Sequence, residues 1–496
     1  MHNKPINVIL IISDTFRYDC LEGTFTVRNK CVKVPNLKSL AGQSAYFTRA
    51  YIASFPTVPN RHDILVGRYT FTYYGWAPLP KNEVVLPEIL RKERGYTSMM
   101  IADTPHILKD GFNYDRGFDG WIWIRGQEND RYRTDPIEVK LPCSPEKLRN
   151  VDTTIQHLRN NALRQFEEDW IPAKTATEAI RWLERNYKRT FLLYVDFFDP
   201  HEPWDPPKWY VEMYDPGYQG EEVIYPVYGP CDYLSKDELE HCRAMYAGEV
   251  TLVDHWIGKI LEKVDELGLY EDTAIIFTSD HGFYLGEHGL IGKSIIMGKY
   301  HGSAPLYEEI VHIPLVIRLP DCMGGGKHIK VDELAQPPDI TATILDLAGI
   351  DYKKYGIQGE SLLPYIKGEK KGLREMAISS PPLIHGVSGG LRPTITTKEW
   401  ALILASAETP ALEKVEYTMM VDGVPRILRP FGKIDTELYN LINDSKEEHN
   451  VIDEHLDVAR RLHKEFIAFL RKLGTNEQYI KPFLNCKRLG SIHLKV

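Results

Sequence analysis

The sequence lacks three features, and each absence argues against a class of protein. No apolar run is long enough to cross a membrane, and the run at 6–12 is too short for a span and carries no signal-peptide cleavage pattern. Basic residues are not in excess, since the net charge is −9 and the pI is about 6.0. We therefore expect a cytoplasmic protein with neither a nucleic-acid partner nor a membrane partner.

Paired cysteines are the third missing feature. The seven cysteines are scattered along the chain, odd in number and without a C-x-x-C motif. This pattern predicts buried or idle thiols in a reducing compartment rather than a disulfide framework or a zinc site.

The length of 496 residues, with 43% hydrophobic residues, predicts more than one folded unit. Apolar strands alternate with helices over 1–375, which predicts an α/β domain with a mostly parallel sheet. An irregular, Trp-, Arg- and Asp-rich insertion is expected at about 107–175, with a helix near 152–167. Over 376–496, strand-like pieces precede one amphipathic helix at about 455–473, which predicts a small α+β subdomain.

A strand-to-helix turn at Thr57 is the segment around which we organise the chain. An alternating strand at 45–51 precedes it, and a short apolar run follows. A hydroxyl at a helix start can point into a cleft, where backbone N–H groups and the helix dipole favour an anion. Arg61 follows one helical turn later and can lie over the same spot. The alternative is a purely structural role, in which Thr57 caps the helix and Arg61 is a surface cation.

Two further strands end in groups that bind metals. Asp14 follows the buried run at 8–12, and Asp280 and His281 follow the run at 274–278. Ligand sites in open α/β sheets lie beyond the carboxyl ends of the strands, so we expect these side chains at one edge. Carboxylate and imidazole together predict a divalent-cation site. The alternatives are a helix cap for Asp14 and a polar turn for the other two.

Four histidines and a lysine are further candidates. His106 and His201 follow strands at 96–102 and 191–195, and prolines on both sides of His201 predict that it is presented rather than packed. His288 and Lys293 belong to a Gly-rich loop, and His301 lies in the long loop at 294–304. We expect that loop and the segment at 107–135 to shape a pocket.

Five segments resemble, in order, motifs of the sulfatase family within the alkaline phosphatase superfamily. They are VILIISD at 8–14, SFPTVPNRHDILVG at 54–67, FDPHEP at 198–203, SDHG with GEHGLIGK at 279–282 and 286–293, and ELYNLIND at 437–444. The second is similar to the signature S-P-x-C-x-P-S-R…L-x-T-G, and the fourth to S-D-H-G…G-E-H-G-L-x-G-K. The resemblance runs nearly end to end.

The resemblance implies an alkaline phosphatase-like α/β/α sandwich with one divalent cation. Its ligands would be Asp14, Asp280, His281 and the Thr57 oxygen, while Arg61 and Lys293 would hold the ester oxyanion. His201 would contact the substrate and could act as the leaving-group acid. Weaker candidates for substrate binding are His106, His288 and His301. Asp63 and Asp254 would play supporting roles.

Three departures from the family pattern bear on the chemistry. Thr57 stands where sulfatases carry the Cys or Ser that matures to formylglycine, and Thr15 replaces a second aspartate. The lysine of a G-K-W-H motif is also absent at 103–106, where His106 alone remains. The loss of a hard anionic ligand leaves Ca²⁺, Mn²⁺ and Zn²⁺ all open as the cation. The donors for a second cation would be Asp199, His201, His288 and His301.

These departures favour a metal-dependent hydrolase that cleaves a phosphate or phosphonate ester with Thr57 as the nucleophile. One alternative is a sulfatase, acting on a sulfuric ester. The other is a non-catalytic protein that binds an oxyanion. The expected partner is a small-molecule sulfate, phosphate or phosphonate ester, and the sequence is compatible with a homo-oligomer.

Overall fold

The computed structural model of the chain describes residues 6–297, 300–387, 390–409, 417–421, 424–428 and 434–492. Its central sheet has eight strands in the order β14-β4-β13-β9-β1-β7-β5-β6. In that order the strands are Ile329–Ala335, Ala45–Ala50, Leu315–Arg318, Thr273–Ser279, Asn7–Ser13, Phe191–Phe197, Thr97–Ala102 and Gly120–Trp123. Only β13 runs antiparallel to its neighbours. This confirms the predicted α/β class with a mostly parallel sheet.

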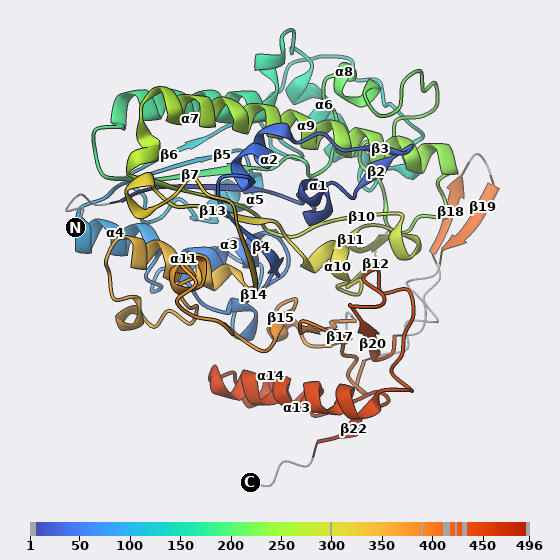
Figure 1. Ribbon diagram of the computed structural model, residues 1–496. Coiled ribbons are helices and arrows are strands. Elements are labelled where there is room, and N and C mark those ends of the chain that lie inside the picture. Colours follow the sequence, from blue (N-terminus) through green and yellow to red (C-terminus); the bar gives the residue numbers. More distant parts are fainter. Residues whose placement is uncertain are drawn as a thin grey trace.

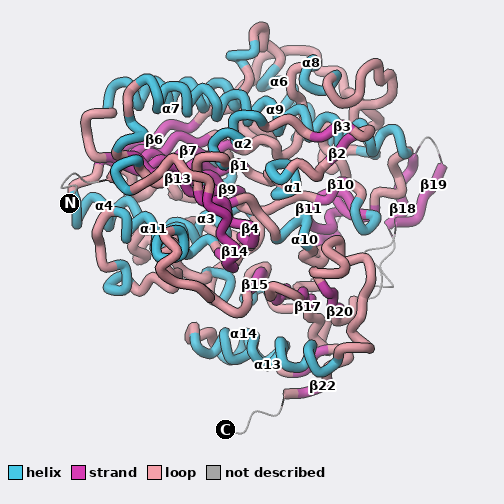
Figure 2. The backbone as a smooth tube through the Cα atoms, viewed as in Figure 1, coloured by secondary structure: helices cyan, strands magenta, loops and turns pink. Residues whose placement is uncertain are grey.

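Helices cover both faces of this sheet, which gives three layers (Figures 1 and 2). On one side α7 packs along α9 and against β7, and α2 packs on α9. On the other side α11 packs against α3 and α4. The bounds are Pro35–Ala41 for α2, Ile171–Asn186 for α7, Lys236–Glu266 for α9, Thr57–Val66 for α3, Leu86–Arg94 for α4 and Pro337–Leu347 for α11.

Local sequence accounts for the central elements. All seven residues of β1 are buried because β1 lies between two other strands with helices on both faces. The helix α9 begins at a capping box, in which Ser235 and Glu238 each bond the other's backbone N–H. The helix α3 ends at Gly67, whose φ of 64° is a left-handed conformation that suits glycine.

A second sheet lies beside the carboxyl edge of β9. It joins β8 (Tyr228–Pro230), β10 (Tyr284–Leu285), β11 (Leu290–Met297) and β12 (Tyr300–Gly302). Lys293 therefore lies on a strand, and the prediction of a Gly-rich loop at this point is wrong. The predicted loop at 294–304 is largely the β11–β12 hairpin, with 298–299 outside the described residues.

The segment at 107–175 is only partly an insertion. Its residues Gly120–Trp123 form β6, which pairs in parallel with β5 at the edge of the central sheet. The predicted helix in this segment is α6 (Val151–Asn161). The expected helix is therefore present, and the expectation of an otherwise irregular insertion is corrected by the strand β6.

The C-terminal region carries a small antiparallel sheet and a long helix, which lie below the three layers in Figure 1. The sheet joins β15 (Ala377–Ser379), β16 (Thr394–Thr396), β17 (Trp400–Ile403) and β20 (Glu437–Asn440), and the helix is α13 (Leu456–Lys472). Buried side chains of α13, among them Phe466, share a separate apolar cluster with those of the sheet. The division of the chain at 375 stays a prediction.

The remaining elements are short. The helices are α1 (Tyr18–Glu22), α5 (Pro105–Leu108), α8 (Lys208–Glu212), α10 (Glu308–Val311), α12 (Leu363–Ile366) and α14 (Glu477–Ile480). The strands are β2 (Thr26–Val27), β3 (Lys30–Cys31), β18 (Tyr417–Val421), β19 (Val424–Leu428), β21 (Asn485–Cys486) and β22 (Gly490–Ser491). Within the described residues, no helix has the length and apolarity that a membrane crossing requires.

Candidate active site and metal centre

Thr57 is the first residue of α3 and has no exposed surface. Its hydroxyl oxygen accepts a hydrogen bond from Lys293 Nζ at 3.1 Å and lies 3.4 Å from His281 Nε2. The predicted juxtaposition of a hydroxyl, a helix start and an imidazole is therefore present.

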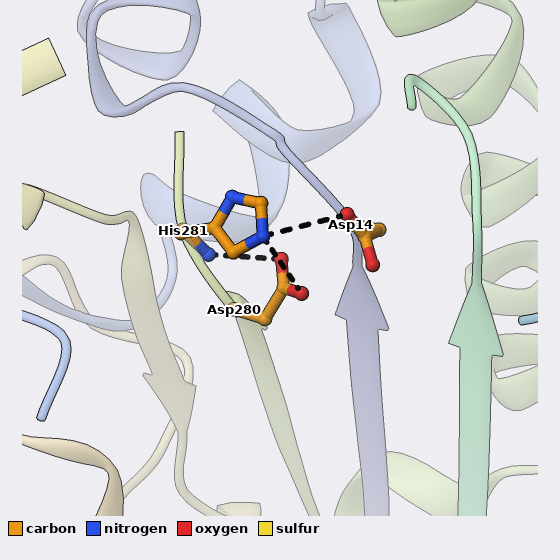
Figure 3. A group of neighbouring side chains, drawn as sticks. All are labelled: Asp14, Asp280 and His281. Carbon is orange, nitrogen blue, oxygen red and sulfur yellow. Dashed lines mark hydrogen bonds and ion pairs between the residues drawn. The ribbon is translucent and has the colours of Figure 1, made fainter. Parts of the chain in front are cut away.

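The predicted metal ligands come together at the carboxyl edge of the sheet. Because β1 and β9 are adjacent and Ser13 is paired with Ser279, Asp14 and Asp280 leave their strands at the same level. One ligand atom each of Asp14, Asp280 and His281 lies within 4.8 Å of the others, and all three residues are buried (Figure 3).

These three residues fit a divalent cation. Among the described residues, neither carboxylate oxygen of Asp14 has a hydrogen-bond partner, although both are buried. His281 Nδ1–H donates to the carbonyl of Gly282 at 2.9 Å, so the lone pair of Nε2 is directed toward the carboxylates. Nε2 lies 3.5 Å from Asp280 Oδ2 and 3.9 Å from Asp14 Oδ1.

The pKa shifts of Asp14 and His281 also favour a bound cation at these three residues. Burial and the neighbouring charge of Asp280 raise the pKa of Asp14 well above its ordinary value. Burial lowers the pKa of His281 to about 3, which keeps the imidazole neutral and able to bind a metal. A cation between the two carboxylates would remove the cost of burying both charges.

Arg61 lies beside these carboxylates and is fully buried. Its Nη1 is 2.5 Å from Asp280 Oδ2, 3.1 Å from Asp14 Oδ2 and 3.2 Å from the carbonyl oxygen of Thr57. Its other edge bonds Asp196, a residue to which the sequence assigned no role. The predicted position of Arg61 over the helix start is present.

Lys293 and His201 complete the surroundings of Thr57. Lys293 Nζ donates to His201 Nε2 at 2.9 Å and to His281 Nε2 at 3.2 Å. His201 Nδ1–H donates to the carbonyl of Glu202, and its ring stacks on Phe198 with centroids 4.1 Å apart. His201 is 2% exposed, so the prediction that it is presented rather than packed is wrong. Burial and the charge of Lys293 lower the pKa of His201 well below its ordinary value.

Comparison with known families settles the relationship of the chain. A family model described as Sulfatase matches residues 6–350. The chain belongs to the sulfatase family. It is accordingly a hydrolase of ester bonds.

Known sulfatases and solved structures resemble this sulfatase-family chain over most of its length. An arylsulfatase of Clostridium perfringens is 28% identical over 410 residues, which are 75% of this chain and 80% of that protein. The phosphonate monoester hydrolase of Agrobacterium radiobacter has a TM-score of 0.65 at 20% identity, covering 99% of this chain and 100% of its own. A structure solved with its substrate D-glucosamine-2-N,6-O-disulfate has a TM-score of 0.66 at 18% identity, covering 97% and 99%. These structures support the alkaline phosphatase-like fold.

His106 packs against Phe198, which stacks on His201, but its imidazole pairs with Glu128. Its Nε2 is 2.9 Å from Glu128 Oε2, and burial lowers its pKa. Glu128 also pairs with Arg149 at 3.0 Å, and Arg149 pairs with Glu202 at 2.9 Å. Sequence reasoning missed Glu128 and Arg149, because they come from irregular backbone with no periodic signal.

His288 and His301 are not brought to Thr57. His288 Nε2 lies 3.2 Å from Glu309 and its ring stacks on Tyr307. His301 is exposed on β12. Neither has a contact with Thr57 in the part of the chain that the structure describes, so a role in substrate binding has no support here.

A second cation has no buried site beside the first among the described residues. In the part of the chain that the structure describes, the donors expected for it, Asp199 included, form no second cluster of ligand atoms. The other such group is Asp444, Glu448 and His449, on the partly exposed surface of the C-terminal region.

Asp63 and Asp254, for which supporting roles were expected, both accept hydrogen bonds. Asp63 accepts from Ser54 and Thr70, and Asp254 accepts from the backbone of α2.

Proposed function

We propose that this protein hydrolyses a phosphate or phosphonate ester with the Thr57 hydroxyl as the nucleophile. The single observation that supports this most is the place of that hydroxyl, at a helix start beside Lys293 Nζ and the imidazole of His281. A formylglycine hydrate has a second hydroxyl that expels the transferred group, and threonine has none. A phospho-threonine intermediate resolved by water is therefore the simplest route.

The first step would transfer the phosphoryl group to Thr57. Its Oγ1 forms a bond to phosphorus while the bond to the leaving oxygen breaks. Lys293 Nζ gives one proton to His201 Nε2, 2.9 Å away, and the lone pair that this frees takes the hydroxyl proton of Thr57, 3.1 Å away. His201 is neutral before the step because its pKa is lowered, and it then returns the proton to the leaving oxygen. Lys293 stabilises the negative charge on the transferring group.

The second step would restore the enzyme. Water attacks phosphorus and gives a proton to His201 Nε2 while the bond to Thr57 Oγ1 breaks. Lys293 Nζ returns a proton to Thr57 Oγ1 and takes one back from His201, so Thr57, Lys293 and His201 all regain their starting states. Asp14, Asp280, His281 and Thr57 Oγ1 would hold a divalent cation. When bound, such a cation polarises the ester and lowers the pKa of a coordinated hydroxyl.

Sulfate ester hydrolysis is the second candidate, and the comparisons support it equally. The family model and the arylsulfatase of Clostridium perfringens favour it. Threonine weighs against it, because a sulfo-threonine would have to be opened by water at sulfur without an internal leaving route.

One panel of substrates separates these candidates. Purified protein is assayed with the nitrophenyl esters of phosphate, a phosphodiester, a phosphonate and sulfate, each with Mn²⁺, Zn²⁺ or Ca²⁺. We expect metal-dependent turnover of a phosphorus ester that Thr57→Ala abolishes and Thr57→Ser partly retains. Turnover of sulfate alone would select the sulfatase. Binding of sulfate or phosphate without turnover, seen by calorimetry, would select a non-catalytic oxyanion-binding protein.

A further inference from the structure

Every N–H group of Arg61 already has an acceptor. A guanidinium carries five N–H donors. Nε donates to Asp196 Oδ2 at 2.8 Å, and Nη2 donates to Asp196 Oδ1 at 2.7 Å and to Thr104 Oγ1 at 3.4 Å. Nη1 donates to the carbonyl of Thr57 at 3.2 Å and to Asp280 Oδ2 at 2.5 Å. Arg61 therefore has no donor left for an ester oxygen unless one of these bonds breaks.

Asp196 holds one edge of Arg61 in a fixed geometry. It is the sixth residue of β7, is fully buried, and takes the guanidinium by two parallel bonds. Two hydroxyls fix the carboxylate in turn: Thr104 donates to Oδ1 at 2.6 Å and Tyr194 donates to Oδ2 at 2.8 Å. The carboxylate of Asp196 thus accepts four hydrogen bonds, and a rotation toward the metal ligands would break them.

The charges around Arg61 indicate why its pairing with Asp196 matters for a bound cation. Arg61 faces Asp280 and Asp14, the two carboxylates that would bind the cation, and a free guanidinium there would compete with the cation for them. Asp196 supplies a third carboxylate that balances the charge of Arg61 and directs only Nη1 toward the other two. Thr104 takes part at the position where the resembled motif carries a lysine.

We propose that Asp196 is a positioning residue, which with Thr104 and Tyr194 fixes Arg61 as an internal counter-ion of the cation-binding carboxylates. Arg61 then acts through the metal centre and does not contact the ester. Among the described side chains around Thr57, Lys293 is the cation that contacts the ester oxyanion. This role of Lys293 rests on the proposed function, whereas the role of Asp196 at the metal centre does not.

The first test measures metal affinity and needs no turnover. Asp196→Asn keeps the shape of the side chain and removes its charge and one acceptor. Titration of the 496-residue protein with Mn²⁺ in a calorimeter should show a Kd raised about 10–100-fold, the usual cost of losing such a supporting group. Thr104→Val should shift the Kd in the same direction by less. An unchanged Kd in both variants would overturn the proposal.

Asp254→Asn is the matched control. Asp254 is also a buried aspartate, but it accepts hydrogen bonds from the backbone of Asn36 and Leu37, away from Arg61. It should lose stability and keep the Mn²⁺ affinity of the wild type. If Asp196→Asn does not fold, Thr104→Val and Tyr194→Phe carry the same test, since each removes one donor to Asp196.

The second test asks what contacts the oxyanion. Inorganic sulfate is titrated into protein saturated with Mn²⁺. Lys293→Gln should weaken sulfate binding about tenfold or more, and Asp196→Asn should leave it within about twofold. An equal loss in both variants would show that Arg61 contacts the anion, and would overturn the inference. If no ester is hydrolysed but Asp196→Asn still weakens Mn²⁺ binding, the proposed function fails and the role of Asp196 stands.

Discussion

Asp14→Asn tests whether a cation links the two buried carboxylates. In the wild type without metal, the ionised Asp14 destabilises the folded state, because burial and the charge of Asp280 raise its pKa well above its ordinary value. The substitution removes that cost and also removes one metal ligand. The variant should therefore melt no lower than the wild type in chelator, and it should gain nothing when metal is added.

The structure sets the scale of the effect. Ligand atoms of Asp14 and Asp280 lie within 4.8 Å of each other. Two unit charges at that distance repel by about 3.5 kcal/mol at an effective dielectric constant of about 20. Arg61, 3.1 Å from Asp14, offsets part of this repulsion. A metal at 100 times its Kd stabilises the wild type by about 2.7 kcal/mol. For a domain of roughly 350 residues, this raises the Tm by about 4 °C.

The assay is thermal unfolding at pH 8 in chelator and then with saturating Mn²⁺, Zn²⁺ or Ca²⁺. Asp444→Asn is the control, because it disrupts the other cluster of possible ligands and should keep the full metal-dependent shift. A shift that survives Asp14→Asn but disappears in Asp444→Asn would place the cation on the C-terminal region. That result would refute the reasoning about the centre beside Thr57.

Three further variants address Lys293, the dependence of stability on pH, and the C-terminal core. Lys293→Gln should lower kcat on the best ester by about 10²–10³-fold, and a loss below about threefold would remove Lys293 from the reaction. His463 is neutral because burial lowers its pKa, so its unfolded form binds more protons and the free energy of unfolding falls as the pH drops below about 6.5. His463→Gln should flatten that dependence in urea unfolding at pH 7.5 and 5.5, and an unchanged slope would contradict it. Phe466→Ala should cost about 3–5 kcal/mol in the same assay, because the ring is fully buried, while Mn²⁺ affinity stays that of the wild type. A loss of that affinity would tie the C-terminal core to the metal centre.

The sequence predicted the centre of the fold well, for physical reasons. Asn7–Ser13 is apolar on both faces, which a strand between two others requires, and that pattern is visible without any partner. Asp14 and Asp280 were predicted together because the carboxyl ends of parallel strands share one edge of the sheet, and the family resemblance added Thr57 to them. The structure brings them there with His281.

The errors come from places where tertiary contacts decide. Lys293 ends a segment with three glycines, which indicated a loop, but β8 and β10 pair with β11 there and make it a strand. His201 lies between prolines, yet its ring is covered by Phe198 and Lys293. Asp196 was missed because its partner Arg61 is 135 residues away, and a carboxylate at a strand end carries no local sign of such a pairing.

The place of β1 in the sheet has a consequence for biosynthesis. Its two neighbours are Phe191–Phe197 and Thr273–Ser279, so the ribosome must add more than half of the chain before both have been made. At about 5–20 residues per second, the wait for the nearer neighbour alone lasts roughly 10–40 s. During translation the apolar run at 8–12 therefore has no neighbouring strand to cover it, and we expect nascent chains that stop before residue 273 to bind chaperones or aggregate rather than to fold.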